Sequence, residues 1–206
     1  MPGATPVNYL RMIPAEQQAK YFGDTGDYAS FGVFGEGTCF FHSVLAAMNY
    51  KDYLARSDKE KKELAYEFRC KLKKTYDSKA HKAHACSSVA PRKFDDVVAD
   101  FCDKSAWADE TMIRHMASLL GINMIFVDDE SDAIYCGVRG KEPFKVTTIV
   151  VRWVSKSHFE PFFRKQAVDR KRRRTAIRGI FDPVNDAQDM AMVLHLMREY
   201  ARQCKT

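Results

Sequence analysis

A glycine-bearing loop leads directly into an amphipathic helix at residues 35–43, whose sequence is Gly-Glu-Gly-Thr-Cys-Phe-Phe-His-Ser. The apolar residues of this region have the i, i+3, i+4, i+7 spacing of one helix face: Phe41, Val44, Leu45 and Met48. Thr38 is suited to the N-cap position, so Cys39 is expected in the first helical turn. The stretch therefore predicts a cysteine held at the point where a tight loop becomes a helix.

A cysteine at a helix N-terminus has a distinctive electrostatic environment. The positive end of the helix dipole lowers the pKa of a thiol and favours the thiolate. The backbone N–H groups of Glu36, Gly37 and Thr38 precede the helical hydrogen bonds, so they are available to bind an oxyanion. We therefore interpret Cys39 as a candidate nucleophile with an oxyanion loop beside it. The alternative is a buried, inert cysteine, which is a common fate of a free thiol.

A cysteine nucleophile needs a base, and the best candidate lies far along the chain. Residues 146–154 are apolar and predict a buried strand, and a short polar turn separates them from Ser157-His158-Phe159-Glu160. In an extended segment His158 and Glu160 point to the same side. Glu160 would then orient the imidazole as the third member of a catalytic triad. The alternative for Glu160 is a solvent-facing strand end.

These stretches resemble the motifs of ovarian-tumour (OTU) cysteine proteases, which are mostly deubiquitinases. Residues 35–42 are similar to the family's Asp-Gly-Asn-Cys-Leu-Phe-Arg block, and residues 157–160 are similar to its His-aromatic-Asn/Asp/Glu block. Between them, residues 107–127 resemble the family's Trp-Gly-x-x-x-Glu-Leu-x-Ala-Leu-Ala helix and the strand after it. The three blocks occur in the family's order, and the resemblance covers about residues 30–163.

The resemblance implies an α+β, papain-like cysteine protease fold. In that fold a small central sheet is flanked by helices, and the nucleophile lies at a helix N-terminus. The implied catalytic residues are Cys39, His158 and Glu160, and the implied oxyanion loop is formed by Glu36, Gly37 and Thr38. The implied partners are conjugates of ubiquitin or a ubiquitin-like protein, and no cofactor or metal is expected.

Two positions depart from the family pattern. Glu36 stands where the family has Asp, and His42 stands where it has Arg or another large residue. His42 lies one helical turn from Cys39. It can tune the thiol, rest against the core, or replace His158 as the base. We interpret Trp107 as a core or corner anchor rather than a substrate contact.

Composition limits the other possibilities. A length of 206 residues favours one domain. No apolar run reaches the ~20 residues of a membrane span, and the N-terminus lacks the basic-then-apolar pattern of a signal peptide. Six scattered cysteines without a CxxC pair suggest a reducing compartment. We expect a soluble monomer that does not bind membranes, in the cytoplasm or nucleus, or in the host-cell cytosol if it is a viral or bacterial effector.

One cluster of metal-ligand residue types occurs outside these motifs. His81, His84 and Cys86 are close in sequence, and Cys70 or Cys102 would complete four ligands. Zinc sites normally use more regular pairs of ligands. We therefore interpret the cluster as a polar surface segment between helices that is accessible to a substrate.

The positive charge is concentrated in one segment. The chain carries a net charge of +6, and residues 164–178 hold eight Lys or Arg and one Asp, so the rest of the chain is nearly neutral. The run Arg-Lys-Arg-Arg-Arg at residues 170–174 fits an import signal or a weak nucleic-acid contact. The alternative is a solvated surface loop or an exposed strand. We expect this segment to be separable from catalysis.

Local signals predict the remaining elements. Helices are expected after Pro14, from the capping box at Ser57, after Pro91, from Asp109 to the stop at Gly121, and at about residues 183–203. Strands are expected at residues 122–127, 134–138 and 146–154, and residues 23–28 are expected to be a loop. The layout is a single catalytic domain with a core at about residues 30–163.

Three functions are consistent with the sequence. The first is a cysteine-type isopeptidase, or deubiquitinase, that hydrolyses bonds to the C-terminus of ubiquitin or a ubiquitin-like modifier. The second is a catalytically weak module that binds ubiquitin. The third is a nucleic-acid-associated protein that uses residues 164–178. The presence of both Cys39 and His158 favours the first over the second.

Overall fold

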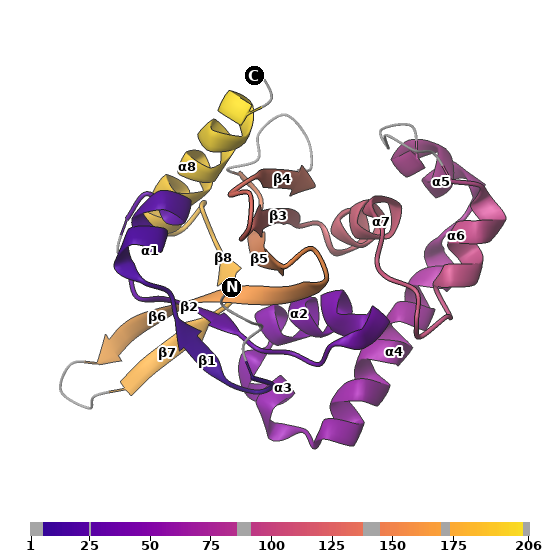
Figure 1. Cartoon of the computed structure of the whole chain (residues 1–206), viewed down its shortest axis with the longest axis horizontal. Coiled ribbons are helices and arrows are strands. Elements are labelled where there is room, and N and C mark those ends of the chain that lie inside the picture. The colour runs from indigo at the N-terminus through magenta and orange to yellow at the C-terminus, as the bar shows by residue number, and fades with distance from the viewer. Residues whose placement is uncertain (1–5, 25, 86–91, 138–144, 170–173, 204–206) are drawn as a thin grey trace.

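A mixed sheet of eight strands lies at the centre of the chain (Figure 1). The structure is a computed structural model, and it describes residues 6–24, 26–85, 92–137, 145–169 and 174–203. The strands are β1 (Leu10–Met12), β2 (Tyr28–Phe31), β3 (Asn123–Asp128), β4 (Ile134–Gly137), β5 (Thr148–Val154), β6 (His158–Asp169), β7 (Arg174–Arg178) and β8 (Ile180–Phe181). Their order is β1-β2-β6-β5-β3-β4, with β7 paired to β6 and β8 paired to β5.

The neighbouring strands are antiparallel except for β3 and β5, which run parallel. The link between β5 and β6 is a tight hairpin whose turn holds Ser155 and Lys156 in the left-handed region, with φ of 48° and 52°. Val154 pairs with His158 and Arg152 pairs with Glu160 across this hairpin. The hairpin therefore places His158 at the first position of β6.

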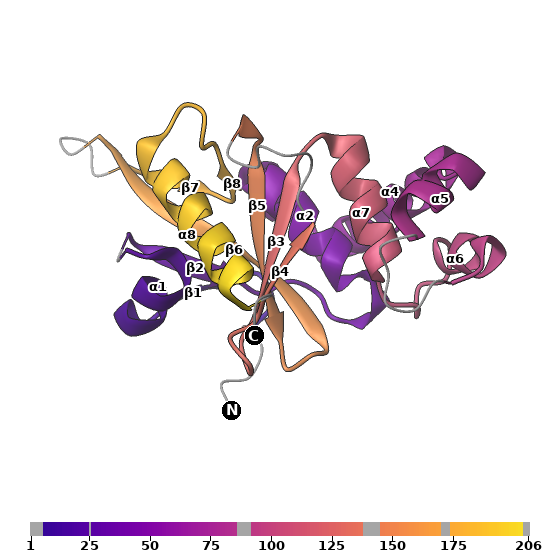
Figure 2. The same cartoon turned by 90° about the horizontal axis from the view of Figure 1, so that it is seen from above.

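Helices cover both faces of the sheet (Figures 1 and 2). On one face lie α1 (Ala15–Phe22) and α8 (Ala187–Gln203), and on the other lie α2 (Cys39–Met48) and α7 (Glu110–Leu120). The helix α3 (Tyr50–Ala55) follows α2 and packs its Tyr50 ring against Phe31 of β2 and Phe163 of β6. The helices α4 (Asp58–Thr75), α5 (Ser78–Ala85) and α6 (Phe94–Asp100) come next and extend away from the sheet (Figure 2). A single 3-10 turn, η1 (Glu36–Thr38), precedes α2.

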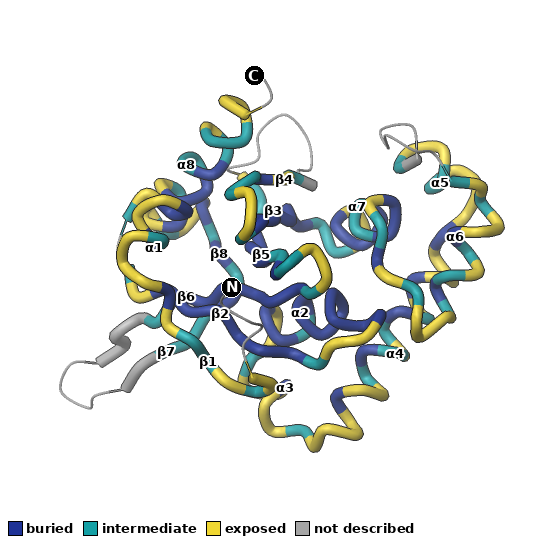
Figure 3. The backbone as a smooth tube through the Cα atoms, in the orientation of Figure 1, coloured by how far each residue is buried: buried dark blue, intermediate teal, exposed yellow. Residues whose placement is uncertain are grey.

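The alternation of side chains along the strands builds two hydrophobic clusters. In β6, Phe159 and Phe163 point toward α2, whereas Phe162 points toward α1 and α8. In β5, Val151 belongs to the cluster on the α2 side, and Val150 belongs to the cluster on the α1 and α8 side. Both clusters are buried, as the dark blue segments of Figure 3 show for the sheet and α2. Close packing on both sides therefore holds Cys39 at the start of α2 and His158 at the start of β6.

The structure confirms the predicted α+β class and most of the predicted elements. Ser57 forms the capping box of α4, the Asp109 carboxylate accepts a hydrogen bond from the Met112 N–H at 2.8 Å, and Gly121 ends α7 with φ of 67°. The predicted strands correspond to β3, β4 and β5 with slightly shifted ends. None of the described helices combines the length and the apolar character needed to cross a bilayer.

Three boundaries differ from the prediction. The predicted loop at residues 23–28 gives way at its end to Tyr28, which begins the buried strand β2. The last helix begins at Ala187 rather than near residue 183, because the Asp186 carboxylate accepts hydrogen bonds from the first N–H groups of α8. Pro91, predicted at the start of a helix, lies outside the described residues, and α6 begins at Phe94.

The basic segment forms the end of β6 and the strand β7, and residues 170–173 at its centre lie outside the described residues. At its two ends the charge is neutralised. Arg164 is buried and pairs with Asp186 at 2.7 Å and Asp189 at 2.8 Å. Arg178 pairs with the same two carboxylates, at 2.9 and 2.7 Å. These two arginines tie the hairpin to the start of α8, so neither belongs to a solvated basic patch.

Candidate active site

Cys39 is the first residue of α2 and lies against the start of β6. The Ser43 hydroxyl, one turn further along α2, donates to the Cys39 carbonyl and to the Phe159 carbonyl, each at 2.9 Å. Because His158 immediately precedes Phe159, these contacts place the start of β6, which carries the candidate base, beside the first turn of α2.

The protonation state of Cys39 differs from the prediction. The side chain is only 1% exposed, and burial raises the pKa of its thiol to about 11. Hydrogen bonds from the Phe159 and Phe40 backbone and the charge of Arg69 lower this pKa in part, without offsetting burial. The helix N-terminus therefore does not produce a thiolate in the resting protein, because desolvation of the charged sulfur has the larger effect. The thiol needs a base when it reacts.

The predicted oxyanion loop is a tight turn under backbone strain. Glu36 has φ of 65°, in the left-handed region that a residue other than glycine seldom occupies. Thr38 occupies the N-cap position as predicted, but its side chain makes no capping hydrogen bond. The Cys39 N–H donates to the Glu36 carbonyl, which closes the 3-10 turn. The N–H groups of Gly37 and Thr38 thus remain the better candidates for binding an oxyanion.

His158 and Glu160 point to the same side of β6. His158 is half-buried, and burial lowers the pKa of its imidazole below the ordinary value of 6.5, while the nearby Glu160 carboxylate raises it in part. The imidazole is therefore neutral near pH 7 and able to accept a proton. Glu160 is 0% exposed, so the alternative of a solvent-facing strand end is wrong.

Arg152 holds the Glu160 carboxylate in the sheet, and sequence reasoning missed it. Its guanidinium lies 3.4 Å from Glu160 and 2.9 Å from Asp129, and all three side chains are buried. Asp129 also accepts a hydrogen bond from the Ser155 N–H at 3.0 Å in the hairpin turn. The signal in the sequence was a lone arginine within an apolar strand. The cluster thus gives the buried Glu160 carboxylate a cationic partner.

His42 rests against the core, which was one of its predicted roles. Its Nδ1 lies 2.9 Å from the Tyr53 hydroxyl, and its ring packs 5.3 Å from that of Phe34. Its Nε2 is buried without a hydrogen-bond partner among the described residues. Burial lowers the pKa of His42 to about 4. An imidazole with so low a pKa is a weak base, which favours His158 for proton transfer.

The buried His42 makes the stability of the protein depend on pH. Its folded pKa of about 4 lies below the ordinary value of 6.5, so between these values the unfolded chain binds the proton and the folded chain does not. Stability is therefore complete above pH 6.5 and falls as the pH approaches 4. We expect His42→Asn, which keeps a hydrogen-bonding group for Tyr53, to remove about 3 kcal/mol of this pH-dependent loss.

Urea unfolding of both proteins at pH 7 and pH 4 measures this effect. The quantity compared is the difference in unfolding free energy between the two pH values, so a general loss of stability in the variant cancels. An equal loss on acidification in both proteins would show that another group titrates.

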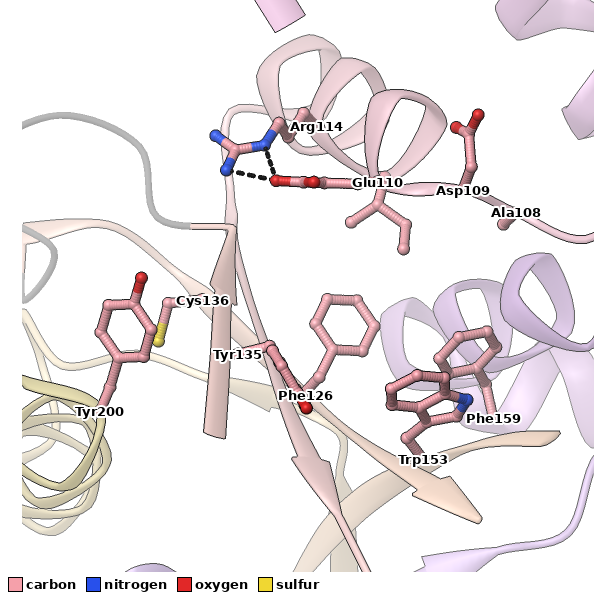
Figure 4. Close-up of a pocket in the computed structure, with 11 residues that line it drawn as sticks. Ala108, Asp109, Glu110, Arg114, Phe126, Tyr135, Cys136, Trp153, Phe159 and Tyr200 are labelled. Atoms are coloured by element: carbon pink, nitrogen blue, oxygen red, sulfur yellow. Dashed lines mark hydrogen bonds and ion pairs between the residues drawn. The ribbon is translucent and has the colours of Figure 1, made fainter. Parts of the chain in front are cut away.

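A pocket of about 520 Å³ opens beside Phe159 (Figure 4). The rings of Trp153 and Phe159 stack at 6.0 Å in its wall. Its other lining residues are Ala108, Asp109, Glu110, Ile113, Arg114, Phe126, Tyr135, Cys136 and Tyr200. The Glu110 carboxylate at its edge is paired with Arg114 at 2.6 Å, so an apolar side chain is the group best suited to the pocket.

Trp107 does not lie in the core, which was one of the two anchoring roles predicted for it. The side chain is 45% exposed. It precedes Ala108, which lines the pocket, and follows Ala106, whose carbonyl contacts the oxyanion loop. The exposed indole therefore belongs to a segment that touches both the pocket and the loop before Cys39.

The candidate metal ligands have other partners. His81 Nδ1 lies 2.7 Å from the Tyr76 hydroxyl, and the His84 ring lies 5.7 Å from that of His115. Cys86 lies outside the described residues. Within the described part of the chain, no group of three or more His, Cys, Asp or Glu residues is arranged to hold a metal ion.

Two solved OTU domains are similar to this chain. The OTUD1 OTU domain superposes with a TM-score of 0.52 and 20% identity, over 72% of this chain and 93% of that one. An OTU domain in complex with ubiquitin superposes with a TM-score of 0.52 and 12% identity, over 95% and 98%. No protein-family model and no curated protein sequence matches. The chain therefore has the fold of OTU domains, as its motifs implied.

Proposed function

We propose that this chain, which has the fold of OTU domains, is a cysteine-type isopeptidase that hydrolyses bonds to the C-terminus of ubiquitin or a ubiquitin-like protein. The observation that carries the proposal is the junction of α2 and β6. There the Ser43 hydroxyl donates to the Cys39 carbonyl and to the Phe159 carbonyl, each at 2.9 Å, and the adjacent His158 is half-buried, with an imidazole pKa that burial lowers. Support for the substrate class comes from the similar OTU domain that was solved with ubiquitin.

The proposed reaction begins with proton transfer from the Cys39 thiol to His158. The sulfur attacks the carbonyl carbon of the isopeptide bond, and the carbonyl π electrons move onto oxygen, where the N–H groups of Gly37 and Thr38 bind the oxyanion. Collapse of this intermediate breaks the C–N bond, and the lysine amine leaves with the proton from His158. A thioester between Cys39 and the ubiquitin C-terminus remains.

Water then resolves the thioester. His158 accepts a proton from the water, the resulting hydroxide attacks the thioester carbon, and the C–S bond breaks. The sulfur departs with the proton from His158, which regenerates the Cys39 thiol. The ubiquitin C-terminus leaves as a carboxylic acid, which loses its proton to solvent and becomes a carboxylate. The Glu160 carboxylate stabilises the imidazolium, as the acid of a catalytic triad does. In this proposal, the pocket beside Phe159 takes an apolar side chain of the substrate.

Hydrolysis of a fluorogenic amide at the C-terminus of ubiquitin tests the proposal, followed by a panel of all diubiquitin linkages and ubiquitin-like reporters. Turnover of at least one substrate is expected. Binding of ubiquitin without turnover of any substrate would favour the catalytically weak binding module instead. Absence of both, with salt-sensitive retention on nucleic acid, would favour the third hypothesis.

A further inference from the structure

A single arginine on α4 joins the oxyanion loop to a distant segment of the chain. Arg69 is 0% exposed, and its Nη1 donates to the Gly37 carbonyl at 2.9 Å and to the Ala106 carbonyl at 2.6 Å. Its Nε donates to the Phe101 carbonyl at 3.1 Å, and its Nη2 donates to the Asp100 carbonyl. The guanidinium also lies over the Phe41 ring in α2, 5.1 Å from its centroid.

Residues 100–109, the segment that contains Ala106, also support the oxyanion loop through a second contact. A Cβ atom on Gly37 would lie 2.5 Å from both the Lys104 and the Ala106 carbonyl oxygens. Only glycine allows this approach, because any other residue would force the two backbones apart. Arg92 fixes the two ends of the segment, since it pairs with Asp100 at 2.7 Å and with Asp109 at 2.9 Å. The oxyanion loop thus rests on a segment that is itself held in place.

The direction of the Gly37 carbonyl determines the direction of the next N–H. In a planar trans peptide the C=O of one residue and the N–H of the next point in opposite directions. Because the Gly37 carbonyl accepts from Arg69, the Thr38 N–H points away from α4. Rotation of this peptide would therefore cost the hydrogen bond to a buried guanidinium.

We infer that Arg69 is a positioning residue for the proposed reaction, which holds the Gly37–Thr38 peptide so that the Thr38 N–H can bind the oxyanion. The inference rests on the proposed function. A planar guanidinium suits this task, because its five N–H groups reach several carbonyls at once. A lysine ammonium keeps the charge but not the planar fork.

The test separates formation of an oxyanion from attack by the thiol. Hydrolysis of a ubiquitin C-terminal amide requires the oxyanion hole. Labelling by ubiquitin that ends in a propargylamine group does not, because the sulfur adds to a carbon–carbon triple bond. In that step a C–S bond forms, one C–C π bond breaks, and the thiol proton ends on carbon. Labelling thus reports binding of ubiquitin and reactivity of Cys39 without any charge on oxygen.

We expect Arg69→Met and Arg69→Lys to lower kcat for hydrolysis by roughly 10²-fold, the typical effect of losing one oxyanion donor. The KM and the labelling rate should remain within about threefold of wild type, since these report binding and thiol reactivity. Arg202→Met on α8, which removes an exposed arginine from an ion pair, is the matched control and should leave all three quantities unchanged.

Equal falls in hydrolysis and labelling would overturn the inference, because they would show that Arg69 serves only the fold or substrate binding. Unchanged hydrolysis in folded variants would also overturn it. Should both Arg69 variants fail to fold, Gly37→Ala is the second test, because the added methyl group displaces the loop from its contact with Ala106. A fall in kcat for hydrolysis at an unchanged labelling rate supports the inference. Equal falls in hydrolysis and labelling oppose it. Failure of the wild-type protein in both assays would instead refute the proposed function.

Discussion

Replacing Cys39 by alanine is expected to lower kcat for a ubiquitin C-terminal amide by at least about 10⁴-fold, because no other group forms the thioester. The same variant should not be labelled by propargylamine-terminated ubiquitin. The fold should survive, since the change removes one buried sulfur from the start of α2 and costs on the order of 1–2 kcal/mol. Mass spectrometry of the labelled protein and thermal unfolding measure these outcomes.

Cys70→Ala provides the matched control, because Cys70 is a partly exposed free cysteine on α4. It should keep the hydrolysis and labelling of the wild-type protein. Labelling of the Cys39→Ala protein at the wild-type rate would show that another cysteine is the nucleophile. Binding of ubiquitin by the unlabelled variant would show that the loss is chemical and that the recognition surface is intact.

Local signals in the sequence were sufficient for the helices α4 and α7. The capping box at Ser57, the cap at Asp109 and the stop at Gly121 each act within a few residues, and each is present in the structure. The strand β2 was missed because Tyr28–Phe31 follows a polar, turn-rich stretch and is only four residues long. Its burial comes from pairing with β6, which no local pattern reveals.

The supporting residues of the candidate site were missed because they act over long sequence distances. Arg69 contacts the carbonyl of Gly37 and that of Ala106 only after α4 has packed beside both segments. Arg152 reaches Asp129 across the parallel pair of β3 and β5. Arg152 is a single charged residue in an otherwise apolar strand, whereas Arg69 is one of many charged residues in α4 and has no distinctive signal in the sequence.

The pKa of Cys39 shows how a local argument can give the wrong sign. Its position at a helix N-terminus was identified correctly, and this position does favour a thiolate. Burial by Phe159 and the surrounding core removes water from the sulfur, and the cost of desolvation raises the pKa to about 11. Helix position can be read from spacing, whereas burial depends on segments far away in the sequence.

Graded losses of activity are expected when the base and its carboxylate are replaced. His158→Ala should lower kcat/KM most, by roughly 10³- to 10⁴-fold, because it removes the general base. Glu160→Ala should cost less, and Glu160→Gln least, because glutamine keeps an acceptor for the imidazole N–H. The fold should tolerate both Glu160 variants, since Arg152 keeps its ion pair with Asp129 at 2.9 Å.

The pH profile distinguishes an orienting carboxylate from a merely structural one. Neutral His158 accepts the proton, so kcat/KM rises with pH through the pKa of His158, which burial places below 6.5. The Glu160 carboxylate raises this pKa, and its replacement by glutamine should therefore move the acid limb of the profile to lower pH. On the alkaline side activity should stay level past neutrality, because the pKa of Cys39 is about 11.

Glu63→Gln on α4 is the matched control for Glu160→Gln, because Glu63 is an exposed carboxylate paired only with Lys59 within the described chain, at 3.8 Å. It should leave both the rate and the pH profile unchanged. Full activity in both Glu160 variants would exclude Glu160 as the third member of the triad and direct attention to Glu36 in the oxyanion loop. A slower Glu160→Gln enzyme with an unshifted acid limb would mean that the carboxylate supports β6 without acting on His158.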